Sequence, residues 1–169
     1  MRIGFRLCLL LLIAAHSAKS LADTGTWTSY HNTRFGTTAD VPPGWRAGPP
    51  PENNDGLIFT SPDGAARLII SGMLNIEDDL AVAFKFYEMP EEGEVITYKH
   101  RAGNAITISG TKDGKIFYAK HLLSCHNQIW NSIYLEYPAA RKAAFDALVA
   151  HVARSLEPGK GDQIQNCMD

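Results

Sequence analysis

The sequence lacks the short motifs that mark the common classes of enzyme. It has no G-x-S-x-G turn for a serine nucleophile, no H-E-x-x-H pair for zinc, and no glycine-rich loop that opens a helix to hold phosphate. The glycines fall instead in segments with the composition of turns. We therefore expect a non-enzymatic protein, with no catalytic residues, no resident metal and no cofactor.

Basic clusters and long apolar runs are also scarce. No run of Lys and Arg builds a cationic face, which argues against nucleic acid and anionic lipid as partners. The one marked apolar run, Leu7 to Ala15, follows Arg2 and Arg6 and precedes small residues at Ser20 and Ala22. This order is typical of a secretory signal peptide and is too short for a permanent membrane anchor. We expect cleavage after residue 22 and a soluble periplasmic or secreted protein, with no membrane insertion after signal removal.

Export changes the charge of the chain and the chemistry of its cysteines. Three of the 16 Lys and Arg residues, and none of the 18 Asp and Glu residues, lie in residues 1–22, so the exported part is acidic. It keeps two cysteines, Cys125 and Cys167, in an oxidising compartment. A disulfide between them is the favoured interpretation and would stabilise the fold by about 4 kcal/mol. Two free thiols, or a reactive Cys125, are the alternatives.

Most of the remaining sequence consists of extended segments separated by turn residues. A Ser-Pro-Asp-Gly turn at 61–64 predicts a hairpin over residues 57–73. Asp113-Gly114 predicts a second hairpin, between Ala105–Gly110 and Lys115–Ser124. The other extended segments are expected at Trp27–Tyr30 with its continuation Arg34–Val41, at Glu94–Arg101, and at Gln128–Tyr137.

Two segments have helical spacing instead. Apolar residues from Ile76 to Tyr87 recur every three or four positions, with Asn75 as the expected N-cap. A second apolar stripe runs from Phe145 to Leu156. Several strands are apolar at both alternating positions, so helices or a second layer should cover each face of the sheet.

The candidate reactive residues do not form a recognisable site. His121, Cys125 and His126 have the side chains of metal ligands. On a strand, however, His121 and Cys125 would lie about 13 Å apart, too far to share one zinc or copper ion. Cys125 or a histidine acting in a pocket remains an alternative, as does a carrier of a small ligand or metal, because sequence does not show which base lies within reach.

The loop over residues 47–56 is the candidate ligand-binding site. Trp45 precedes it, and Asn53, Asn54 and Asp55 place side-chain amides and a carboxylate near that aromatic ring. Long ordered loops often carry function, and this one has groups suited to sugar, peptide or Ca²⁺. The alternative interpretation is a turn built from residues that favour turns.

Two runs of residues resemble a known family. Tyr30-x-Asn32-x-x-Phe35-Gly36 followed by Pro42-x-Gly44-Trp45 resembles the opening of the PsbP-like and Mog1-like family. The run from Asn54 to Ala66 looks like an uncharacterised exported proteobacterial branch of that family, and the closing helix also fits.

The resemblance implies an α+β fold, an α/β/α sandwich with a central, mainly antiparallel sheet flanked by helices. We expect one such domain over 23–158 and a polar tail over 159–169. In that family, plant members are extrinsic photosystem subunits and a nuclear member binds a small GTPase. No residues here match either activity. The expected role is therefore a binding or accessory protein whose partner is an unknown protein or cell-envelope component.

Overall fold

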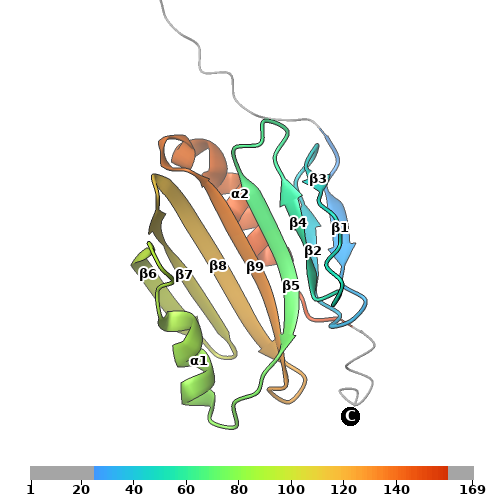
Figure 1. Cartoon of the computed structure of the whole chain (residues 1–169), viewed down its shortest axis with the longest axis vertical. Coiled ribbons are helices and arrows are strands. Elements are labelled where there is room, and N and C mark those ends of the chain that lie inside the picture. Colours follow the sequence, from blue (N-terminus) through green and yellow to red (C-terminus); the bar gives the residue numbers. More distant parts are fainter. Residues whose placement is uncertain (1–24, 160–169) are drawn as a thin grey trace, which may run out of the picture.

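A seven-stranded antiparallel sheet forms the centre of the computed structural model, which describes residues 25–159 (Figure 1). The strands lie in the order β3-β4-β5-β9-β8-β7-β6. Their bounds are β3 Arg46–Ala47, β4 Gly56–Thr60, β5 Arg67–Leu74, β6 Val95–Ala102, β7 Ala105–Lys112, β8 Lys115–Ser124 and β9 Ile129–Pro138. The signal peptide expected at residues 1–22 and the tail beyond residue 159 lie outside the described residues, so both stay predictions.

The two hairpins expected from turn residues are present. In the turn between β4 and β5, the Gly64 amide donates to the Ser61 carbonyl at 2.9 Å. Between β7 and β8, Asp113 and Gly114 both have positive φ, 49° and 76°. Two such residues form the turn whose twist matches that of antiparallel strands. Local sequence therefore determines both reversals.

The first two strands form a separate sheet, contrary to expectation. β1 (Thr28–His31) and β2 (Thr38–Val41) pair with each other, so the continuous extended segment predicted through residues 34–41 was wrong. The chain reverses at Asn32, whose side-chain oxygen accepts the Phe35 amide at 2.7 Å and whose carbonyl accepts the Gly36 amide at 2.8 Å. Gly36 completes the reversal with a φ of 74°.

One face of the large sheet is covered by β1–β2 and by helix α2 (Lys142–Ser155), which follows a short 3₁₀ turn at Ala139–Arg141. The helix packs its predicted apolar stripe against this face, with Phe145, Val152 and Leu156 buried and the rest of the stripe partly buried. This core contains Ala39, Val41, Leu68, Ile70, Ile133, Leu135, Tyr137, Phe145, Val152 and Leu156.

The opposite face is covered over part of its area by helix α1 (Leu80–Glu88) (Figure 1). This helix begins later than predicted, because Asp79 rather than Asn75 is its N-cap and accepts the Ala81 amide at 2.7 Å. Asn75 is engaged elsewhere, since its side-chain oxygen lies 3.3 Å from the Trp130 indole nitrogen. The second core contains Ala83, Phe84, Ile106, Ile108, Phe117, Ala119, Leu123 and Trp130.

The sheet therefore lies between a helix on each side, as the fold class predicted. β9 supplies buried residues to both cores, including Ile133 to one and Trp130 to the other. β6, by contrast, is a sheet edge and is exposed along nearly its whole length. Coverage of both faces thus holds for the central strands and fails at this edge.

Close packing of the two sheets leads to a first prediction. A Cβ atom added at Gly72 would lie 2.2 Å from the Phe35 Cβ, so Gly72→Ala forces β5 away from the β1–β2 loop. We expect a loss of about 1–3 kcal/mol of unfolding free energy in urea titrations, the usual cost of overpacking. Gly48→Ala is the control, because its nearest contact would be 3.4 Å. Equal losses in the two variants would contradict this packing.

The disulfide expected between Cys125 and Cys167 also yields a test. Cys167 lies outside the described residues, so the pairing stays a prediction, but the geometry around Cys125 supports it. Cys125 packs with Phe35, and Gly159 lies against the neighbouring Gly36. The chain from Gly159 to Cys167 reaches about 26 Å when extended.

We expect intact-mass analysis of the exported protein to show two hydrogens fewer than the reduced form. Cys125→Ser and Cys167→Ser should each lower the unfolding free energy by about 4 kcal/mol, and the double variant should lose no more than either one. Titration of two thiols in the unfolded, unreduced protein would disprove the bond.

Candidate binding surface beside helix α1

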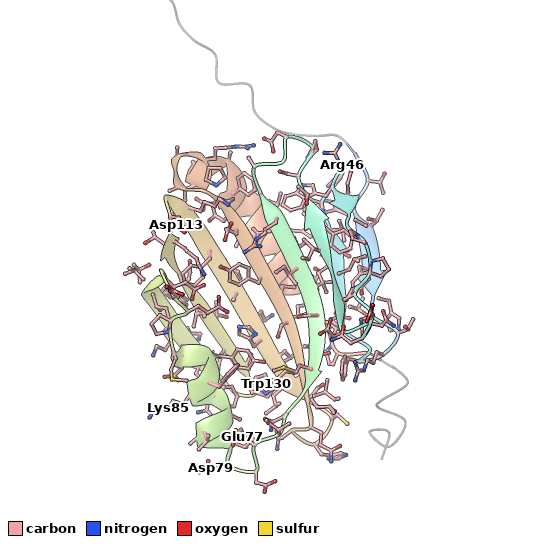
Figure 2. The ribbon with its side chains drawn as sticks, viewed as in Figure 1. Arg46, Glu77, Asp79, Lys85, Asp113 and Trp130 are labelled. Atoms are coloured by element: carbon pink, nitrogen blue, oxygen red, sulfur yellow. The ribbon has the colours of Figure 1, made fainter. Side chains whose placement is uncertain are left out.

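A cavity of about 510 Å³ lies where α1, the end of β5 and the loop before β4 meet. We call it the α1 hollow. Figure 2 shows Trp130 on the sheet beside α1, with Glu77 and Asp79 on the segment that leads into the helix. The lining residues are Arg34, Phe35, Asn53, Asp55, Gly72, Met73, Leu74, Asn75, Ile76, Glu77, Ala83, Phe86 and Trp130.

The loop on one side of the hollow is fixed by a buried asparagine. Asn32 is only 1% exposed, and its amide donates to the Asn54 carbonyl at 2.9 Å. Asn54 itself has a φ of 49° and donates to the Thr33 hydroxyl at 3.0 Å. A buried amide must find partners, so these bonds hold the loop against the β1–β2 turn.

Most polar side chains of the hollow bond to other protein groups. Arg34 donates to the Asn53 carbonyl at 2.6 Å, and the Asn53 amide donates to the Asp55 carboxylate at 2.8 Å. On the other side, Asn75 accepts from Trp130 and donates to the Asn127 carbonyl at 2.9 Å. These groups brace the walls, and the surface offered to a ligand is mainly apolar.

Four large apolar side chains of the hollow are open to solvent. Ile76 is 87% exposed and Phe86 is 59% exposed, and Met73 and Leu74 are each more than two-fifths exposed. Ile76 is exposed because α1 begins at Leu80, so this residue is not on the buried face of the helix. Contiguous exposed apolar surface with a polar rim marks an interaction site more often than scattered single residues do.

The structure separates the four residues predicted to bind a ligand. Asn53 and Asp55 line the α1 hollow, and Asn54 holds their loop in place. Trp45 lines a different cavity, beside α2. The segment between them runs along β4, where the Gly48 amide donates to the Ile58 carbonyl at 2.8 Å. Their ligand-binding role stays a prediction, now for two surfaces instead of one.

Sequence reasoning missed the apolar side of the hollow. The residues that form it, Met73, Leu74, Ile76 and Phe86, come from a strand end, a linker and a helix. The one local signal is Phe86, which lies outside the apolar stripe predicted for residues 76–87. The exposure of Ile76, by contrast, depends on where the helix begins, and that start was misplaced.

None of the described residues considered as metal ligands or catalytic groups lines the hollow. His121 is 8% exposed, its Nδ1 is 2.8 Å from the Ser132 hydroxyl, and its ring stacks on Tyr87 at 3.8 Å. Cys125 and His126 lie in the turn after β8, in the left-handed backbone region. Within residues 25–159, no three His, Cys, Asp or Glu side chains are placed to hold a metal ion. The His121–Ser132 pair lines neither of the two large cavities.

Comparison with solved structures identifies the fold. The Ran-binding protein Mog1p of Saccharomyces cerevisiae is similar over 80% of this chain and 97% of its own, with 12% identity and a TM-score of 0.56. The cyanobacterial PsbP (CyanoP) of Synechocystis sp. PCC 6803 is similar over 79% of this chain and 93% of its own, with 14% identity and a TM-score of 0.60.

The chain therefore has the fold that Mog1 and PsbP share, as the sequence resemblance predicted. At these identities the likeness concerns the fold and not the activity. No protein-family model and no curated protein sequence matches the chain. Neither of the helices in the described part has the length and apolar character needed to cross a bilayer.

The buried histidine makes stability depend on pH. Burial lowers the pKa of His121 from its ordinary value of 6.5 to about 3. Between about pH 3 and pH 6.5, the unfolded chain binds a proton at His121 that the folded chain does not. The unfolding free energy therefore has its full value above about pH 6.5 and decreases as the pH drops below it. We expect a loss of up to about 1.4 kcal/mol per pH unit.

Urea unfolding at pH 7, 6 and 5 measures this slope before most carboxyl groups titrate. His121→Gln, which keeps an amide to pair with Ser132, should flatten the slope over that range. Parallel slopes for the two proteins would show that His121 is not the group responsible.

Proposed function

We propose that this chain is an exported, non-enzymatic binding or accessory protein that contacts another protein of the cell envelope through the α1 hollow. The observation that carries the proposal is the set of solvent-exposed apolar side chains that line it, led by Ile76 and Phe86. Export is supported by the basic start, apolar run and small residues within residues 1–22.

A protein partner accounts for the shape of this surface better than a small ligand does. Small-molecule sites enclose most of the ligand, with a few polar groups directed at it. In the hollow, by contrast, Ile76 and Phe86 project into solvent, and most of the polar side chains, those of Arg34, Asn53, Asp55 and Asn75, are engaged in bonds within the protein. An apolar centre with aromatic and methionine side chains and a polar rim is the usual anatomy of a protein interface.

The charged residues around the hollow are suited to orienting a bound partner rather than to catalysing a reaction. Arg34, Asp55 and Glu77 lie on its rim with both signs interspersed. Such groups set the register of a complex while the apolar centre supplies most of the binding free energy. The name of yeast Mog1p describes a protein of this fold that binds another protein, which supports the same class of role.

The proposal is tested by photo-crosslinking in cells that express the full chain. A photoreactive phenylalanine analogue at position 86 should yield a discrete crosslinked species in the envelope fraction. The same analogue at position 98 is the matched control, because Tyr98 is similarly exposed, at 52%, but lies on β6 outside the hollow. Equal crosslinking at both positions, or none at position 86, would contradict the proposal.

Substitution then measures the contribution of the apolar centre. We expect Phe86→Ser to weaken binding of the captured partner about thirtyfold, the effect of losing a central aromatic side chain. Tyr98→Ser should leave affinity unchanged. Thermal unfolding of both variants within a few degrees of the natural protein confirms that the loss is local, since Phe86 is mostly exposed.

A further inference from the structure

A second cavity, of about 450 Å³, lies between α2 and the turns that follow β2 and β4. We call it the α2 groove. It shares no lining residue with the α1 hollow, and Arg46, which bonds to its wall at the Pro62 carbonyl, lies at the opposite end of the sheet from Trp130 (Figure 2). The α2 groove can therefore act independently of the proposed α1 interface.

Aromatic and proline rings form a large part of the groove. Trp27 and Trp45 line it together with Phe145, Pro42, Pro43 and Pro62, and three aliphatic residues of α2 add to the apolar surface. The helix contributes one face, because Ala144, Ala147, His151 and Arg154 line the groove at spacings of three and four. The local sequence explains this wall, since Pro42-Pro43-Gly44 ends β2 and turns the chain toward α2.

The first tryptophan is held in a fixed orientation. The Trp27 ring stacks on the His151 imidazole, with centroids 3.7 Å apart and planes 12° from parallel. His151 is itself fixed, because its Nε2 lies 2.8 Å from an Asp40 carboxylate oxygen. A rigid aromatic wall binds a ligand with little loss of side-chain entropy.

The groove offers hydrogen-bond donors but few acceptors. Within residues 25–159, the indole N–H groups of Trp27 and Trp45 and the guanidinium of Arg154 donate no hydrogen bond. The side-chain oxygens of the lining are already engaged. Asp63 accepts from Ser61 at 2.6 Å, from the Ala65 amide at 3.1 Å and from Arg141 at 2.6 Å. The Ser61 hydroxyl in turn accepts the Ala66 amide at 2.9 Å.

We propose that the α2 groove binds an extended, proline-containing segment of a partner protein that carries a carboxylate. A proline segment has carbonyl acceptors and no backbone N–H, so it matches a wall of unpaired donors. Its preformed polyproline II shape docks on aromatic-lined grooves with a small entropy loss. The carboxylate pairs with Arg154, the lining cation that has no acidic partner within residues 25–159.

The same inventory argues against a sugar. Each hydroxyl of a sugar donates as well as accepts, and the side-chain oxygens of Ser61 and Asp63 already accept hydrogen bonds, which leaves little acceptor capacity for those donors. A sugar that filled the groove would therefore leave its own polar groups unpaired, at a cost in affinity.

The test uses the three tryptophans of the chain as reporters. The indole N–H signals are followed by nitrogen–proton correlation spectroscopy during addition of the blocked peptide acetyl-PPPPPE-amide. We expect saturable shifts of the Trp27 and Trp45 signals. The Trp130 signal should not move, because that indole bonds to Asn75 in the other cavity. The peptides acetyl-GSGSGE-amide and acetyl-PPPPPQ-amide separate the effects of the proline rings and of the carboxylate.

Two variants of groove residues, with one control variant on α1, test whether the peptide contacts the groove directly. Trp45→Ala should weaken binding of acetyl-PPPPPE-amide at least tenfold. Arg154→Gln should weaken it about threefold to tenfold and leave the affinity for acetyl-PPPPPQ-amide unchanged, whereas Lys85→Gln, on α1, should change neither. Four outcomes overturn the proposal: no shift, equal shifts with the glycine-serine peptide, shifts caused instead by chitotriose, or concentration-dependent shifts that show a second copy of the chain in the groove. Loss of the α1 interface would leave these measurements unchanged.

Discussion

Burial of β9 between two layers is the constraint on which the rest of the structure depends. This strand lies between β5 and β8 and contributes large side chains to both cores, Ile133 and Leu135 on one face and Trp130 on the other. A strand whose side chains are apolar on both faces of the sheet must be covered on both sides. The two helices and the β1–β2 sheet supply that cover, and their positions follow from it.

The two layers cover the sheet to different extents, and the candidate interface results from the difference. α2 extends over 14 residues and packs beside β1–β2, which together fill one face. α1 has nine residues and buries only Ala83 and Phe84 fully. The shorter helix leaves Phe86 and the linker residue Ile76 in solvent beside Trp130. The apolar surface that we assign to a partner is thus the part of the second face that the chain itself does not cover.

Sequence reasoning succeeded where the information was local. Asp113-Gly114 specifies its turn, because both residues adopt positive φ. In α2, the spacing of the apolar residues in the sequence indicates which face of the helix is buried. It failed where a distant partner decides the outcome. Asn75 was assigned to a helix end because its competing bond to Trp130 is 55 residues away in sequence. The reversal at Asn32 likewise depends partly on the Asn54 carbonyl.

For the candidate sites, too, the sequence predicted the local features and missed those that depend on distant parts of the chain. Asn53, Asp55 and Trp45 all line cavities, but proximity in sequence suggested one surface where the fold makes two. The segment between them runs alongside β4 and carries them to opposite ends of that strand. The local sequence does not indicate that Ile76 is exposed or that Trp27 and Trp45 line the same cavity. Each of these features depends on which helices and strands pack together.

Native-state hydrogen exchange tests most directly whether β9 is the shared support of both layers and α1 the weaker one. The account predicts that amides at the centre of β9, such as those of Ile133 and Leu135, exchange only through global unfolding. Amides of α1 should exchange through a local opening of distinctly lower free energy. Equal opening free energies for α1 and β9, or a β9 that exchanges before the helices, would contradict it.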